Sequence, residues 1–199
     1  MKKTKVYFTK EITSEALVKL YKKLNIELPK PTAVKLHSGE EGNQNYLKPE
    51  FMKDIIEEVD GVVVECNTAY EGARNTTAKH QKLMQEHGWD KYYQVDIMDS
   101  EDDITLEIPN GKIIKKDYVG NHLNNYKSML VLSHFKGHPM GGFGGALKQL
   151  SIGVASSSDK GKDHLIERIE SRHGNHIIDA AANLKFGTKD YELINIDNI

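Results

Sequence analysis

Short β-branched runs alternate with amphipathic segments along the first half of the chain, and this alternation limits the fold more than any other feature. Five runs have the length and composition of strands, namely 5–9, 32–37, 62–66, 92–97 and 129–133. Segments of helical periodicity separate the first four runs and begin near Thr13, Pro49 and Thr76. Because strand–helix–strand units form right-handed crossovers, the sequence predicts an α/β fold with a largely parallel sheet flanked by helices.

The middle of the chain departs from this rhythm. Two alternating runs, 104–108 and 112–116, flank an Asn-Gly pair at Asn110 and Gly111, which is typical of a β-hairpin. We therefore expect a β-hairpin excursion at the edge of the sheet. Beyond Ser158 the pattern predicts two helices and a closing strand at 191–196. Together these elements indicate one α/β domain over 1–199, with 159–199 supplying the C-terminal helices and the closing strand.

The composition excludes several classes of protein. The chain has 199 residues, of which 38% are hydrophobic and 28% charged, which is enough to bury one core. A net charge of −2 with scattered lysines gives no electrostatic surface for nucleic acid. No run approaches the roughly 20 apolar residues of a membrane span, and no signal peptide follows the basic start. We therefore expect a cytoplasmic protein without nucleic-acid or membrane partners.

Cys66 is the single cysteine of the chain. One thiol excludes an intramolecular disulfide and a four-cysteine zinc site, and a conventional iron-sulfur cluster takes about four thiolates. We therefore expect no iron-sulfur cluster in this chain. Since Cys66 ends a predicted strand, its expected role is that of a small buried hydrophobe.

Polar residues follow the apolar run 129–133. If the strand continued, His134, Lys136 and His138 would point to one face, but the two imidazoles would stand about 13 Å apart at roughly 3.3 Å per residue. Only a turn would bring both onto one metal ion. Joint metal ligation, separate roles in lining a pocket, and purely structural roles all remain open.

A glycine-rich stretch, 141–145, comes next and is followed by Lys148. Glycines before a helical start leave backbone N–H groups able to meet an anion, and a lysine in the next turn adds charge. The spacing matches neither of the common phosphate-loop motifs. A flexible turn explains the glycines equally well.

Further polar residues follow the second and third predicted strands. Lys35, His37 and Asn43 come after one, and Asn67 and Arg74 come after the next. Carboxyl ends of parallel strands share one edge of a sheet, so these loops and the segment around His134 are predicted to surround one concavity. Polarity alone is also normal for solvated loops.

Five further histidines lie on or beside predicted helices. Their expected places are the protein surface or the helix caps, rather than a ligand set: His80, His87, His164, His173 and His176.

Four segments, in this order, carry a resemblance: KLHSGEEGN, ECNTAYEGAR, LVLSHFKGH and GGFGGALKQLSIGVAS. Together they resemble a family of bacterial and archaeal proteins known as domain of unknown function 362, or as iron-sulfur-centre proteins. The family core corresponds to 1–158. Relatives are usually longer and carry cysteines after this core, so the resemblance implies a shortened form that lacks the cysteine-bearing region. The motif positions that it shares are Lys35, His37, Gly42, Asn43, Asn67, Tyr70, Arg74, His134, Lys136, His138, Gly144, Gly145 and Lys148.

The sequence therefore predicts an anion- or metal-binding site at the carboxyl edge of the sheet, in what the resemblance suggests is the core of a redox-associated enzyme. The predicted ligand-binding residues are Lys35, Asn43, Asn67, Arg74, Lys136, Gly144, Gly145 and Lys148. A divalent metal is a candidate cofactor, with His37, His134 and His138 as its ligands. The alternative is a non-catalytic interaction or scaffold protein. A homodimer is expected, because the apolar strands 62–66 and 129–133 require cover on both sides.

Overall fold

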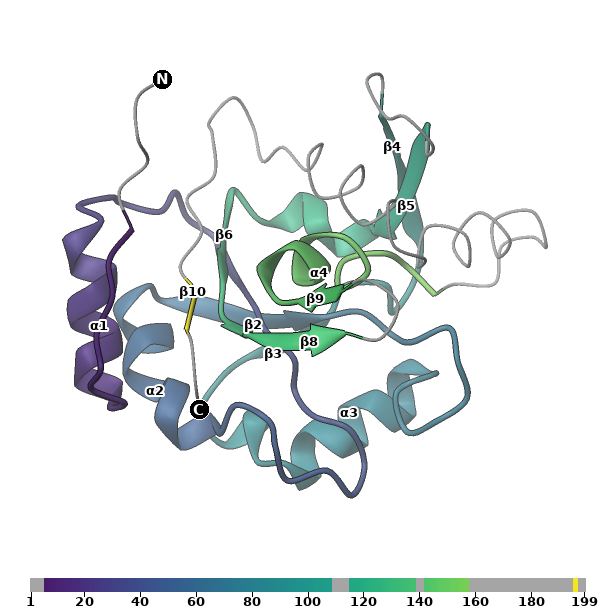
Figure 1. The fold of residues 1–199 in the computed structure, drawn as a ribbon. Coiled ribbons are helices and arrows are strands. Elements are labelled where there is room, and N and C mark those ends of the chain that lie inside the picture. Colours follow the sequence, from purple (N-terminus) through teal and green to yellow (C-terminus); the bar gives the residue numbers. More distant parts are fainter. Residues whose placement is uncertain (1–5, 109–114, 139–141, 158–194, 197–199) are drawn as a thin grey trace.

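A four-stranded parallel sheet forms the centre of the chain in a computed structural model, which describes residues 6–108, 115–138, 142–157 and 195–196 (Figure 1). Its strands are β1 Thr32–Lys35, β2 Gly61–Glu65, β3 Val95–Ile97 and β6 Ser128–Val131, in the order β3-β2-β1-β6. All three pairings are parallel. The predicted α/β class with a largely parallel sheet is therefore confirmed.

The helices before β3 begin where the sequence predicts. They are α1 Ser14–Lys23, α2 Pro49–Glu58 and α3 Thr77–Glu86, with a short 3-10 turn, η1 Trp89–Lys91, after the last. The side chains of Thr13 and Thr76 cap α1 and α3 by accepting backbone N–H groups of the first turn. Gly88, with φ of 82°, ends α3 in the left-handed conformation that glycine adopts without strain.

Side chains of the strands alternate between two cores, one on each face of the sheet. Val34 and Val63 pack with α1, α2 and α3, whereas their neighbours Ala33 and Val64 face the other core. That second core is closed by the segments after β3, chiefly β5 Lys116–Gly120, η2 Asn121–Asn125 and α4 Ala146–Leu150. The sheet is thus buried on both faces, as its apolar strands require.

The predicted hairpin exists, and its second strand continues beyond the predicted end to Gly120. β4 Asp103–Glu107 pairs antiparallel with β5, so that Asp103 lies opposite Gly120. Of the predicted second strand, 112–116, the structure describes residues 115 and 116, and Lys116 is the first residue of β5. Residues 112–114 and the Asn-Gly pair lie outside the described residues. The hairpin is a separate two-stranded sheet and not an edge of the main one. Burial of Val119 in the second core sets the register, which a local turn signal could not show.

The predicted first strand, 5–9, is wrong over the residues that the structure describes. Residues 6–9 have no regular structure, and Val6 and Phe8 are 87% and 71% exposed. β1 pairs with β2 on one side and β6 on the other, so no place beside it remains for this segment.

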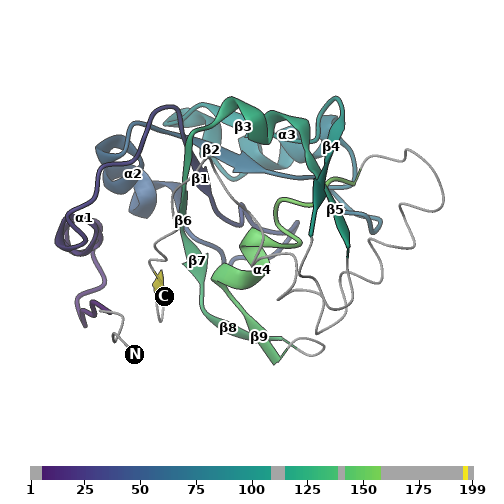
Figure 2. The same cartoon turned by 90° about the horizontal axis from the view of Figure 1, so that it is seen from above.

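After β6 the chain forms shorter elements beneath the sheet edge (Figure 2). β7 Ser133–His134 pairs with β10 Asn195–Ile196, and β8 Lys136–His138 pairs with β9 Gly142–Gly144. β10 falls inside the predicted closing strand, whereas the predicted helices beyond Ser158 lie outside the described residues. In the part of the chain that the structure describes, no helix has the length and apolar character to cross a membrane.

Gly120, the last residue of β5, packs closely against the backbone that follows β3. We therefore expect Gly120→Ala to destabilise the protein. A Cβ there would lie 2.5 Å from the backbone carbon of Met98, so the backbone must shift. Overpacking of this kind lowers the unfolding free energy by about 1–3 kcal/mol, measurable by urea denaturation. Gly137→Ala is the matched control, because nothing lies within 4 Å of the position that its added methyl group would take. Equal stability of the two variants would contradict this packing.

Candidate functional site

A pocket of about 240 Å³ opens at the carboxyl ends of β1 and β2, beside the segment that follows β6. The chain first extends the sheet from β1 to β2 and β3 and then crosses to β6 on the other side of β1. The strand order therefore reverses between β1 and β6. In open α/β sheets this switch point is where ligands bind.

The pocket brings together ten of the eleven residues predicted for the site. These are Lys35, His37, Asn43, Asn67, Arg74, His134, Lys136, Gly144, Gly145 and Lys148. The side chain of His138, the eleventh, lies outside the described residues. Their common location supports the expectation that loops after parallel strands gather at one edge, while their roles stay predictions.

Lys35 forms the floor of the pocket and is 1% exposed. Its Nζ donates to Glu65 Oε2, to Gln149 Oε1 and to the carbonyl oxygen of Leu36, each at 2.7 Å. A lysine ammonium has three N–H donors, so these acceptors account for all of them. Lys35 is thus a residue that fixes β2 and α4 to β1, rather than a group directed at a ligand.

Glu65 is the buried counter-ion of this lysine and is 3% exposed. Its Oε1 accepts the backbone N–H of Ser38 at 2.9 Å and lies 3.6 Å from His37 Nδ1 and 3.7 Å from Arg74 Nη1. Burial alone would raise the pKa of Glu65, but Lys35, His37 and Arg74 hold it well below its ordinary value. The carboxylate is therefore ionised, and it interacts with the side chains of Lys35, His37 and Arg74 around it.

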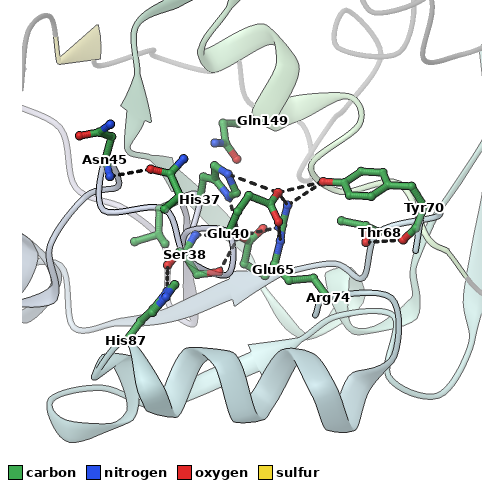
Figure 3. Close-up of polar contacts among 12 residues, drawn as sticks. His37, Ser38, Glu40, Asn45, Glu65, Thr68, Tyr70, Arg74, His87 and Gln149 are labelled. Atoms are coloured by element: carbon green, nitrogen blue, oxygen red, sulfur yellow. Dashed lines mark hydrogen bonds and ion pairs between the residues drawn. The ribbon is translucent and has the colours of Figure 1, made fainter. Parts of the chain in front are cut away.

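Glu40, Tyr70 and Arg74 connect the loop after β1 with the loop after β2 (Figure 3). Arg74 binds Glu40 through both Nε, at 3.1 Å, and Nη2, and the Tyr70 hydroxyl donates to Glu40 Oε1 at 2.8 Å. Burial opposes ionisation of Glu40, yet Arg74 lowers its pKa below the ordinary value. The forked guanidinium contact makes this the main link between the two loops.

His80 is a buried residue, which corrects the expectation of a surface or capping position. It is completely buried, and its Nδ1 lies 3.3 Å from Asn67 Oδ1, while the Asn67 amide donates to Thr77 Oγ1 at 3.1 Å. Burial lowers the pKa of His80 to about 4, so the ring is neutral at pH 7. Its spacing from Leu83 and Met84 on the inner face of α3 was the signal for burial.

The loop after β1 is held in place by α3 and η1. The Ser38 carbonyl oxygen accepts the indole N–H of Trp89 at 3.0 Å and lies 2.9 Å from His87 Nδ1. His87, the C-cap residue of α3 as expected, stacks on Tyr46 with ring centroids 4.3 Å apart. Gly39 has φ of 106° and passes so close to these two rings that a Cβ would clash.

Cys66 also lines the pocket, at its base. It is buried, as predicted, and its thiol donates to the Val154 carbonyl oxygen at 3.3 Å. Burial, reinforced by Asp99, raises the pKa of Cys66 well above its ordinary value. The sulfur is therefore a protonated thiol with little nucleophilic character.

The metal-binding prediction has limited support from the geometry. His37 and His134 both line the pocket, but the residues described here contain no group of three or more His, Cys, Asp or Glu side chains placed to hold an ion. The carboxylates nearest His37, those of Glu40 and Glu65, are already paired with Arg74 and Lys35.

Sequence reasoning missed several residues that organise the site. Among them are Ser38 and Gln149, which hold the ion pair of the floor, and His80. Lys35 and Glu65 stand at the ends of otherwise apolar strand runs, and this position was a usable signal for a buried ion pair. Charged residues are rarely buried unless they are paired.

We expect Glu65→Gln to destabilise the fold, because it leaves the buried Lys35 without its counter-charge. Removal of one partner of a buried pair costs about 3–5 kcal/mol, to be measured as unfolding free energy in urea. Glu40→Gln is the control, since its side chain is partly exposed and its loss should cost less. Similar losses in both variants would refute the central role of Glu65.

The same carboxylate predicts loss of stability in acid. Its pKa in the folded chain lies below the ordinary value of 4.5, so its contribution is complete above pH 4.5 and declines as the pH falls below that value. The unfolding free energy of the unmodified protein should fall with acidification more steeply than that of Glu65→Gln. Parallel pH profiles would show that Glu65 is not responsible.

Comparison with known proteins gives one match. The family model described as "Domain of unknown function (DUF362)" matches residues 32–199. No curated protein and no solved structure matches the chain. The match begins at the first residue of β1 and includes all the segments that line the pocket. It covers well over half of the sequence, and the chain therefore belongs to the DUF362 family.

Proposed function

We propose that the pocket at the switch point binds a small anionic ligand. The observation that carries this proposal is the charge of its lining. Among the described residues, four basic side chains line it, Lys35, Arg74, Lys136 and Lys148, against two acidic ones. The excess is two positive charges before either histidine is counted, although the whole chain has a net charge of −2.

These charges are arranged so that the floor and wall of the pocket are neutral in sum, whereas its rim is basic. Lys35 with Glu65, and Arg74 with Glu40, form two ion pairs in the floor and wall. The remaining positive charge of the lining comes from Lys136 on β8 and Lys148 on α4. An anion that enters would meet these lysines over a floor whose charges already balance.

The size of the pocket favours a small molecule. Its volume of about 240 Å³ lies below the range of roughly 300–1,000 Å³ that drug-sized ligands occupy. The glycines at 144 and 145 and the loop after β1 form its walls. These dimensions suit a monophosphate or carboxylate compound better than a polymer.

We expect the double variant Lys136→Ala, Lys148→Ala to bind inorganic phosphate at least about tenfold more weakly than the unmodified protein. Hydrogen bonds to charged groups contribute about 1.5–3 kcal/mol each, and 1.4 kcal/mol corresponds to tenfold. Isothermal titration calorimetry at low ionic strength measures the affinity, because salt screens such contacts.

Lys53→Ala is the matched control for this experiment. It removes one lysine from α2, where Lys53 contacts Glu57, and leaves the pocket lining intact. Phosphate affinity should be unchanged in this variant. If the unmodified protein binds no phosphate, or if the double variant binds it equally well, the proposed function is wrong. Phosphate binding that requires an added divalent metal would instead support the divalent metal that the sequence predicts as a cofactor.

A further inference from the structure

We propose that the ligand of this pocket carries a planar ring beside its anionic group, and that this ring packs against Tyr70. The inference rests on the proposed function, because it describes a second part of the same ligand. It is carried by the exposure of Tyr70 within the pocket and by the contacts that fix its ring.

Tyr70 lines the pocket and is 54% exposed. Its neighbours in the polar network differ, since Arg74 and Glu65 are buried. Burial of the faces of an aromatic ring is normally favourable in free energy. In a concave site, ring faces are surfaces on which planar ligands stack. Tyr70 therefore offers apolar area at a place where the rest of the lining is mainly polar.

Two hydrogen bonds hold the hydroxyl group of Tyr70. It donates to Glu40 Oε1 at 2.8 Å and accepts from Arg74 Nη2 at 3.1 Å. Glu40 and Arg74 are themselves fixed by the link between the two loops. A ring held at its tip in this way presents its faces without the entropic loss that a mobile side chain would undergo on binding.

A purely structural role accounts poorly for this residue. The charge of Arg74 is already matched by Glu40 and by the nearby Glu65, so a third partner is not needed for neutralisation. The ring does not belong to either hydrophobic core. The contacts with Glu40 and Arg74 use only the hydroxyl at the tip of the side chain, whereas the ring supplies a flat apolar surface.

The position of Tyr70 defines the class of ligand. Figure 3 shows Tyr70 at one end of the polar network and His37 toward the other. Lys136 and Lys148 complete the same lining. A pocket of about 240 Å³ has room for one ring and one compact anionic group. The chemical class is therefore an aryl or heteroaryl monophosphate or carboxylate.

Two probes of the same charge test the inference, namely phenyl phosphate and methyl phosphate. Stacking on an aromatic side chain is worth about 1–3 kcal/mol, so calorimetry should show phenyl phosphate binding about 5- to 150-fold more tightly. Tyr70→Leu should bring this ratio close to one. Tyr70→Phe should retain most of it, because the ring remains while the hydroxyl contacts are lost. Tyr92→Leu, which removes an exposed tyrosine outside the pocket lining, should leave the ratio unchanged.

The outcomes separate this inference from the proposed function. If both probes bind the unmodified protein with equal affinity, the ring inference is wrong and the anion site stands. If neither binds, the proposed function is wrong and the ring inference falls with it. An unchanged ratio in a folded Tyr70→Leu protein would also overturn the role of Tyr70. If that variant does not fold, the ratios of the unmodified protein and of Tyr70→Phe decide the question.

Discussion

An ion pair between neighbouring strands, Lys35 with Glu65, lies inside the protein, and the arrangement of the pocket depends on it. Removing two charges from water is expensive, and such a pair persists only where further polar groups complete its hydrogen bonds. Gln149 and the Leu36 carbonyl oxygen do so for the lysine, and Ser38 does so for the glutamate. Satisfying one buried pair therefore fixes the relative positions of β1, β2, α4 and the loop after β1.

The charged groups of the site therefore differ in their roles. Groups in the floor are occupied with one another, and Glu40 with Arg74 extends the same pairing to the loop after β2. Fixed internal pairs give a rigid floor whose side chains need not reorganise when a ligand arrives. The rim differs from the floor in its composition, because lysines and an exposed aromatic ring dominate there.

Periodicity and strand-end placement predicted most of this arrangement, for identifiable physical reasons. Helices α1, α2 and α3 carried local signals in their caps and their apolar spacing, and the parallel sheet followed from their alternation with apolar runs. Long-range effects were beyond such reasoning. β6 and β2 occupy the two sides of β1 and leave no place there for segment 5–9, and Val119 sets the register of the hairpin through a distant core. The homodimer was expected because the apolar strands need cover on both sides. Both faces of the sheet are covered within the chain itself, so the homodimer stays a prediction.

Trp89, the single tryptophan of the sequence, gives the protein a built-in optical reporter. Its indole N–H donates to the Ser38 carbonyl oxygen, and the backbone N–H of Ser38 donates to Glu65. The indole is also fully buried, so its emission depends on this one protein environment and not on solvent. Fluorescence of the natural chain, without a label or an introduced chromophore, therefore reports directly on the loop that joins the floor of the pocket to its wall.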